Sequence, residues 1–223
     1  MASQVLATIG GSGSHRLMEA LGSRLRVADK PDNVLRPNYH TLWAGRFGTD
    51  QGRFVDRSLG FEWKAGPWLE SGFVDFMRWV DTQQSYALVS GTFAELGLFS
   101  RHRVPGVIFI VRDPVQTLLS WAKPYRHGDV VDYLGGPNSP ACLEFIASRW
   151  NRHAAEALRL RHLGILGGLI RFETAPADAA RLGLEWAFDD FCVDRRSRPD
   201  ELTSESIEYL DRTTREARAE LYR

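Results

Sequence analysis

The chain has 223 residues, of which 43% are hydrophobic and 25% charged, as in an ordinary folded protein. This length suits a single α/β domain over residues 1–223. The 28 basic and 28 acidic residues cancel, which argues against a protein that wraps nucleic acid non-specifically. A local basic pocket for a small anion is still compatible with neutrality.

No run approaches the ~20 apolar residues of a membrane helix, and the segment MASQVLATIGG lacks the positive region of a signal peptide. We therefore expect a cytoplasmic protein with no membrane span. The two cysteines, Cys142 and Cys192, form no CxxC pair and have no zinc-type spacing with histidine, so we expect no metal. Arginine greatly outnumbers lysine, a bias that a GC-rich bacterial genome produces.

The chain begins with an apolar strand, Val5 to Ile9, followed at once by a glycine-rich segment, Gly10 to Ser14. A helix is predicted over His15 to Leu25, because leucines recur every four residues there. A strand, a glycine turn and a helix are the opening of a βαβ unit. Glycines let a backbone approach a phosphate closely, and the new helix presents free N–H groups to it.

Strands and helices alternate along the rest of the chain. Residues 31–85 are rich in aromatic side chains and turn formers and are the least readable part. Alternation of strands and helices predicts an α/β fold with a central, mostly parallel sheet flanked by helices. The further predicted elements are a helix near Trp68 to Thr82, a strand Tyr86 to Ser90, a helix Phe93 to Ser100, a strand Val107 to Val111, a surface loop Pro124 to Pro140, a helix Cys142 to His162, a strand Ile165 to Phe172, and a closing helix after Thr203 and Ser204 with an inner stripe of Ile207, Leu210, Thr214, Ala217 and Leu221.

The glycine-rich segment permits several interpretations. A Walker A loop needs a lysine after its last glycine, and none follows Gly13. A dinucleotide fingerprint starts at Gly11 and Gly13 but has Arg16 where the third glycine belongs. A shorter phosphate loop, in which backbone amides and the Ser12 and Ser14 hydroxyls hold an anion, is the third possibility. A tight turn without a ligand is the structural alternative.

The segment VIFIVRDPVQTLLSW carries a second candidate anion site. Arg112 follows the strand Val107 to Val111, and Ser120 lies about two turns into the next helix. A guanidinium and a hydroxyl at that place can clamp one phosphate. Alternatively, Asp113 and Pro114 only start the helix, while Arg112 pairs with a carboxylate.

Together these segments resemble sulfotransferases, of the cytosolic and bacterial type, that use 3′-phosphoadenosine 5′-phosphosulfate (PAPS). TIGGSGSHRLMEAL resembles their 5′-phosphosulfate loop, and VIFIVRDPVQTLLSWAK their 3′-phosphate motif. SRWNRHAAEAL, GLIRFETAPAD and ELTSESIEYLDRTTREARAELY are similar to later segments of the family, and GLIRFETAPAD places Phe172 and Glu173. Residues 31–85 align with nothing; in the family this region commonly holds the acceptor, as an insertion. The resemblance implies a three-layer, P-loop-like α/β fold.

The resemblance also implies roles for the candidate residues. Arg112 and Ser120 would bind the 3′-phosphate of PAPS and of its product, adenosine 3′,5′-bisphosphate (PAP). Sulfonate would pass to a hydroxyl or amine of a small metabolite, lipid or carbohydrate, with no metal. The 5′-phosphosulfate would be held by Gly10, Gly11, Ser12, Gly13, Ser14 and His15.

The sequence departs from the family at one important position. Family members usually have Lys or Arg just before the Ser-Gly of the loop, where the chain has Gly11. Such a cation stabilises developing negative charge; Arg16, Lys123 and Arg126 are candidate substitutes. Three alternatives stay open: an inactive nucleotide-binding relative, a P-loop small-molecule kinase and, more weakly, a Rossmann dehydrogenase.

The general base that would activate the acceptor is not specified by spacing alone. His40, Glu95 and His15 are the candidates, in that order, and a lone histidine is more often structural than catalytic. Glu173 either orients the phosphate loop or has a structural role at the sheet edge, and we favour the structural role. The aromatic residues of 31–85 serve packing or an acceptor pocket, and the arginines at 195, 196 and 198 most simply form a solvated loop.

Overall fold

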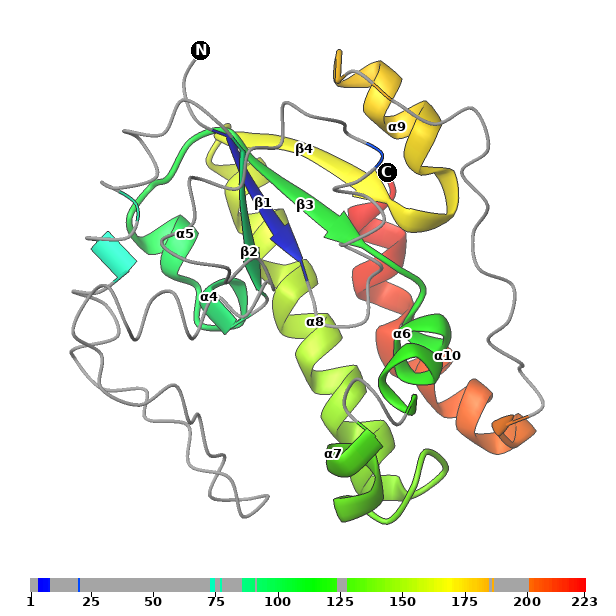
Figure 1. The fold of residues 1–223 in the computed structure, drawn as a ribbon. Helices are drawn as coiled ribbons and strands as arrows, with labels where there is room; N and C mark the ends of the chain where they lie inside the picture. Colours follow the sequence, from blue (N-terminus) through cyan, green and yellow to red (C-terminus); the bar gives the residue numbers. More distant parts are fainter. Residues whose placement is uncertain are drawn as a thin grey trace, which may run out of the picture.

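The computed structural model describes residues 4–8, 20, 73–74, 77, 86–90, 92–123, 128–184, 186 and 201–223. Within these residues the protein has an open, four-stranded sheet of order β2-β1-β3-β4, and all three strand pairings are parallel (Figure 1). The predicted α/β fold with a parallel sheet is thereby confirmed. The strands are β1 (Gln4–Thr8), β2 (Tyr86–Ser90), β3 (Val107–Val111) and β4 (Leu166–Arg171).

The strand order reverses between β1 and β3. β2 lies on one side of β1, whereas β3 and β4 lie on the other side. Thr8 pairs with Ile110 in parallel register, so β1 and β3 end at the same edge of the sheet. In open parallel sheets, ligands bind outside the carboxyl ends of the strands where the order reverses.

β3 is buried along its whole length, as its continuous apolar run predicts. Its side chains alternate between two hydrophobic clusters. Val107, Phe109 and Val111 join one cluster, while Ile108 and Ile110 join the other. β-Branched residues fit such a two-sided strand because they pack well on a pleated surface.

One predicted helix is divided in two. Instead of one helix over Phe93 to Ser100, the chain forms α4 (Thr92–Glu95) and α5 (Leu98–Arg101). Gly97 separates them with a φ of 68°, a left-handed conformation that glycine adopts without steric cost. The prediction of one continuous helix was wrong because Gly97, in this left-handed conformation, redirects the chain.

The segment predicted as the surface loop Pro124 to Pro140 also contains a helix. Val131 of α7 (Gly128–Tyr133) is buried in a hydrophobic cluster. Leu134, the residue directly after α7, is buried in the same cluster. This pair, three residues apart, packs against α6 (Pro114–Trp121), α8 (Pro140–His162) and α10 (Ser204–Leu221). Composition indicated a loop, but two buried aliphatic side chains stabilise a short helix instead.

The two long helices follow the prediction closely. α8 begins at Pro140, where the Ser139 hydroxyl accepts a hydrogen bond from the Cys142 amide. α10 begins after Thr203, whose side chain accepts from the Ser206 amide. The predicted inner stripe of α10 is buried or half-buried throughout.

The helices pack on both faces of the sheet. α8 and α5 join the cluster under Val107, Phe109 and Val111. On the other face, Phe172 of the 3-10 turn η2 (Phe172–Thr174) and two alanines of α9 (Ala175–Arg181) pack against Ile108 and Ile110. Figure 1 shows α8 behind the sheet, with α6 and α10 side by side below the end of β3.

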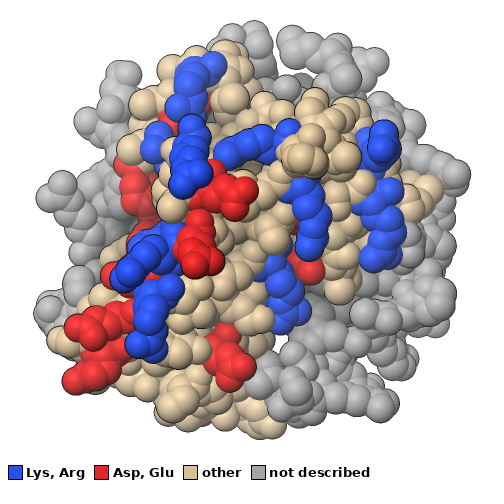
Figure 2. All heavy atoms as spheres, turned by 180° about the vertical axis from the view of Figure 1, so that it is seen from behind, with Lys and Arg blue, Asp and Glu red and all other residues tan. Residues whose placement is uncertain are grey.

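The face seen in Figure 2 carries both signs of charge. Acidic side chains gather mainly on the left of this view, among basic ones, whereas the right half carries mostly basic side chains. Among the described residues, no helix has the length and the apolar character required to cross a bilayer.

Candidate anion site at the end of β3

Arg112 directly follows β3 at the carboxyl edge of the sheet. It is only 5% exposed, and its guanidinium carbon lies 4.7 Å from the centroid of the Phe172 ring. An aromatic face stabilises a partly desolvated cation and fixes the plane of the guanidinium. Ser120, in the last turn of α6, is 2% exposed. The two candidate ligands of a 3′-phosphate therefore come from one βα unit, and both are buried.

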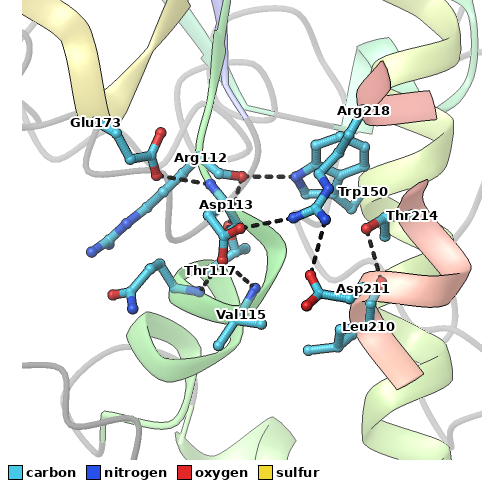
Figure 3. A network of polar contacts seen from close by, with 11 residues as sticks. Arg112, Asp113, Val115, Thr117, Trp150, Glu173, Leu210, Asp211, Thr214 and Arg218 are labelled. Atoms are coloured by element: carbon cyan, nitrogen blue, oxygen red, sulfur yellow. Dashed lines mark hydrogen bonds and ion pairs between the residues drawn. The ribbon is translucent and has the colours of Figure 1, made fainter. Parts of the chain in front are cut away.

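The backbone at Arg112 and Asp113 is held from two sides. The indole Nε1 of Trp150, on α8, donates to the carbonyl of Arg112 at 2.8 Å. The amide of Asp113 donates to Glu173 Oε1 at 2.9 Å. Figure 3 shows both contacts, with the Arg112 side chain extending away from Trp150 and Arg218. Glu173 thus holds the turn after β3, a contact in line with the structural role favoured from the sequence.

Asp113 starts α6 in the manner predicted. Its Oδ1 accepts from the amides of Val115 at 2.9 Å and Gln116 at 3.2 Å, and Pro114 occupies the first helical position. A capping carboxylate satisfies amides that have no partner within the helix. The turn that carries Arg112 therefore has a defined geometry before any ligand binds.

The second oxygen of Asp113 makes an ion pair that the sequence did not predict. Asp113 Oδ2 lies 3.0 Å from Arg218 Nη1, and Arg218 Nη2 lies 2.9 Å from Asp211 Oδ1. Both Arg218 and Asp211 belong to α10. The only sequence signal was that Asp211 and Arg218 share one helix face, being seven residues apart; nothing in the sequence linked that face to Asp113.

Tyr222 and Arg171 extend the polar cluster beyond Arg218. The Arg171 guanidinium carbon lies 5.9 Å from the Tyr222 ring centroid. Partial desolvation of its phenol, together with the nearby carboxylates of Glu173 and Asp113, raises the pKa of Tyr222 to about 12, although the residue as a whole is exposed. Its phenol is therefore neutral at physiological pH and contributes no charge to the site.

Glu95, a candidate general base, is ion-paired. Its Oε1 accepts from Arg149 Nε at 2.9 Å and Nη2 at 2.6 Å, and both side chains are less than 10% exposed. The Arg149 guanidinium also lies 5.0 Å from the ring of Trp121, the residue after Ser120. The pair links α4 to α8 beside the end of α6. Its geometry gives Glu95 a structural function, and a role as base stays a prediction.

Of the other candidate site residues, Lys123 is the one that the structure describes. Lys123 is half-exposed just after α6, whereas Arg126 and the arginines at 195, 196 and 198 lie outside the described residues. So does most of residues 31–85, where only 73, 74 and 77 are described, all three helical. The remaining candidates outside the described residues are Gly10, Gly11, Ser12, Gly13, Ser14, His15, Arg16 and His40.

No group of three or more His, Cys, Asp or Glu side chains suited to a metal ion occurs among the described residues. No protein-family model, curated protein or solved structure matches the chain. The proposal for its function therefore depends on its own residues and geometry.

Proposed function

We propose that this protein is a sulfotransferase that moves a sulfonate from PAPS to a hydroxyl or amine of a small metabolite, lipid or carbohydrate. The observation that carries the proposal is the position of Arg112. A buried arginine stands at the carboxyl end of β3, beside the reversal of strand order, on a turn held by Trp150 and Glu173. Such a cation is suited to a planar, bidentate grip on phosphate.

Chain connectivity supports a second phosphate-binding element at the same edge. Gly10 follows Thr8 by two residues, and Arg112 follows Ile110, the partner of Thr8, by two residues. Two residues span at most about 7 Å. Thr8, which precedes the Gly10–Ser14 segment in the sequence, therefore lies at the sheet edge that carries Arg112. We propose that this segment holds the 5′-phosphosulfate while Arg112 and Ser120 hold the 3′-phosphate, in a three-layer, P-loop-like fold.

The reaction is a single displacement at sulfur. The acceptor oxygen or nitrogen attacks the sulfur atom, the bond from sulfur to the bridging phosphate oxygen breaks, and PAP leaves with that electron pair. The proton of the acceptor passes to a general base, for which His40, Glu95 and His15 are the candidates. Backbone amides of the glycine segment, with Arg16, Lys123 or Arg126, stabilise the charge on the leaving oxygen.

Gly11 favours a second candidate function, an inactive nucleotide-binding protein of the same fold. Without a cation at that position, one source of transition-state stabilisation is missing, and the loss of one such donor costs about 3 kcal/mol. Binding of PAP without sulfonate transfer to any acceptor would identify this case. Transfer that is lost in Arg112→Ala would exclude it.

Calorimetric titration with PAP, ADP and ATP tests the proposal. We expect micromolar binding of PAP, weak binding of ADP, and about a 100-fold weaker affinity for PAP in Arg112→Ala. Arg152→Ala, which removes an exposed arginine from α8, is the matched control and leaves the affinity unchanged. If PAP binds no more tightly than ADP, the 3′-phosphate clamp is wrong. Mg²⁺-dependent ATP binding would then favour a kinase.

A further inference from the structure

The turn that carries Arg112 is held by side chains from three elements that are distant along the chain. Trp150 of α8 binds the carbonyl of Arg112, and Glu173 of η2 binds the amide of Asp113. Arg218, near the carboxyl end of α10, binds the carboxylate of Asp113 (Figure 3). The last of these contacts joins residues 105 positions apart.

The two oxygens of Asp113 have separate tasks. Oδ1 caps α6 through the amides of Val115 and Gln116. Oδ2 faces away from the helix and pairs with Arg218. The ion pair is therefore not needed to start α6, so any contribution it makes must be something other than capping that helix.

Arg218 is itself fixed at both ends of its guanidinium. Nη1 contacts Asp113 and Nη2 contacts Asp211, so the planar fork bridges the turn and the helix. The Arg218 side chain is 24% exposed and that of Asp113 33%. A partly exposed pair contributes little to global stability, but it still restrains the direction of the residue that directly follows Arg112.

We propose that Arg218 is a positioning residue for the anion clamp, acting through Asp113 on the orientation of Arg112. This inference deepens the proposed function and rests on it. A clamp must hold its donors within a fraction of an ångström of the bound phosphate. Removing Arg218 frees Asp113 Oδ2 and widens the range of positions that the turn adopts, so the 3′-phosphate loses affinity more than the rest of the nucleotide does.

The test compares affinity and local opening in matched variants. Arg218→Met keeps most of the aliphatic stem and removes the charge, and Arg218→Lys keeps the charge but not the fork. Asp113→Asn keeps an oxygen to cap α6 and removes the charge facing Arg218. Arg215→Met changes an exposed arginine on the same helix and serves as control. PAP and ADP affinities are measured by calorimetry, and exchange of the Asp113 amide by NMR.

We expect PAP to bind about tenfold more weakly to Arg218→Met and Asp113→Asn, with ADP affinity unchanged and partial rescue in Arg218→Lys. Exchange of the Asp113 amide should accelerate, whereas amides in the middle of α10 and the Arg215→Met control should not change. If Arg218→Met does not fold, Asp113→Asn provides the same comparison.

Two failures are distinguishable. Wild-type PAP affinity with unaltered exchange in both Arg218→Met and Asp113→Asn, beside a large loss in Arg112→Ala, would overturn the positioning role and leave the clamp intact. If the wild type itself does not prefer PAP to ADP, the proposed function fails. The exchange of the Asp113 amide then still decides whether Arg218 holds the turn.

Discussion

His153 and Glu156 lie about one turn apart on α8 and are both almost fully buried, yet their surroundings differ. Glu156 accepts from the Ser100 amide at 2.6 Å and from its hydroxyl at 2.7 Å, and Arg159 lies 3.3 Å away. The His153 ring instead packs 4.8 Å from the Phe109 ring centroid. The carboxylate is compensated by donors, whereas the imidazole is tolerated only because it is neutral.

Burial lowers the pKa of His153 to about 3, and the positive charge of Arg149 adds to this effect. The Ile110 backbone opposes the shift, but none of its contacts with the ring has hydrogen-bond geometry. A histidine in the unfolded chain titrates near pH 6.5. Between about pH 6.5 and 3 the unfolded state therefore binds the extra proton, and stability falls as the pH falls.

We predict that His153 alone lowers the free energy of unfolding by about 2 kcal/mol between pH 7 and pH 5. Replacing it with leucine, an apolar side chain, should remove this part of the pH dependence. Urea unfolding at both pH values measures it, with His162→Leu on the exposed end of α8 as control. The prediction would be contradicted if the free energy of unfolding fell by the same amount between pH 7 and pH 5 in the wild type and in His153→Leu.

Single residues also show which features of the site can be predicted from the sequence without knowledge of the fold. The sequence identified Asp113 as a helix cap and Arg112 as the residue after a buried strand, because both properties depend on near neighbours. It did not identify Arg218 or Trp150 as their partners. Those contacts span 105 and 38 residues, and no local pattern encodes them.

At the scale of elements, β4 contains an irregularity that its two glycines explain. The pairing with β3 shifts at Val107 and Ile108, so that Gly168 is the partner of Ile108 and Gly167 is left without one. An extra residue of this kind is a β-bulge. A Cβ atom at Gly167 would collide with the backbone of Gly106, whereas one at Gly168 would meet only the Leu182 side chain.

We predict that Gly167→Ala destabilises the protein by about 3 kcal/mol and Gly168→Ala by less, about 1 kcal/mol. The Gly106 backbone directly precedes β3 and cannot move without the strand, but the end of the Leu182 side chain can rotate away. Thermal or urea unfolding of both variants, side by side, measures the difference. Equal effects, or a larger effect at Gly168, would mean that the bulge rearranges easily.

The elements that were predicted incorrectly share one cause. The helix at 93–100 is interrupted at Gly97, and α7 lies in a segment whose composition indicated a loop. In both places the outcome depends on packing: Leu98 and Phe99 turn into one cluster, and Val131 and Leu134 into another. Local propensity is weak enough that such burial overrides it.

At the scale of the whole molecule, helix α10 packs beside the Arg112 turn, which belongs to the middle of the chain. α10 packs against α6 and α8 (Figure 1), and Arg218 reaches Asp113 in the turn after β3 (Figure 3). A ligand bound at this turn therefore stabilises contacts among β3, α6, α8 and α10 together. Binding at this turn should therefore raise the free energy of global unfolding.

We predict that PAP at about 100 times its dissociation constant raises the free energy of unfolding by about 2.7 kcal/mol. ADP at the same concentration should have a much smaller effect, because it lacks the 3′-phosphate. Thermal unfolding with and without each nucleotide measures this. Equal stabilisation of wild type and Arg112→Ala by PAP would show that the nucleotide binds elsewhere.

The sequence by itself determined the parts of this protein that depend on short-range order. These are the apolar strands at 86–90 and 107–111, the long helix predicted over 142–162, the closing helix after Thr203 and Ser204, the Asp113 cap, and the expectation of a parallel sheet. Only the tertiary structure decided the strand order, the ion pairing of Glu95 with Arg149, and the closure of the Arg112 turn by Trp150, Glu173 and Arg218. Hydrophobic periodicity and helix capping depend on residues that are close together in the sequence. These tertiary contacts join residues that are far apart in the sequence, and no local sequence pattern indicates which of them will meet.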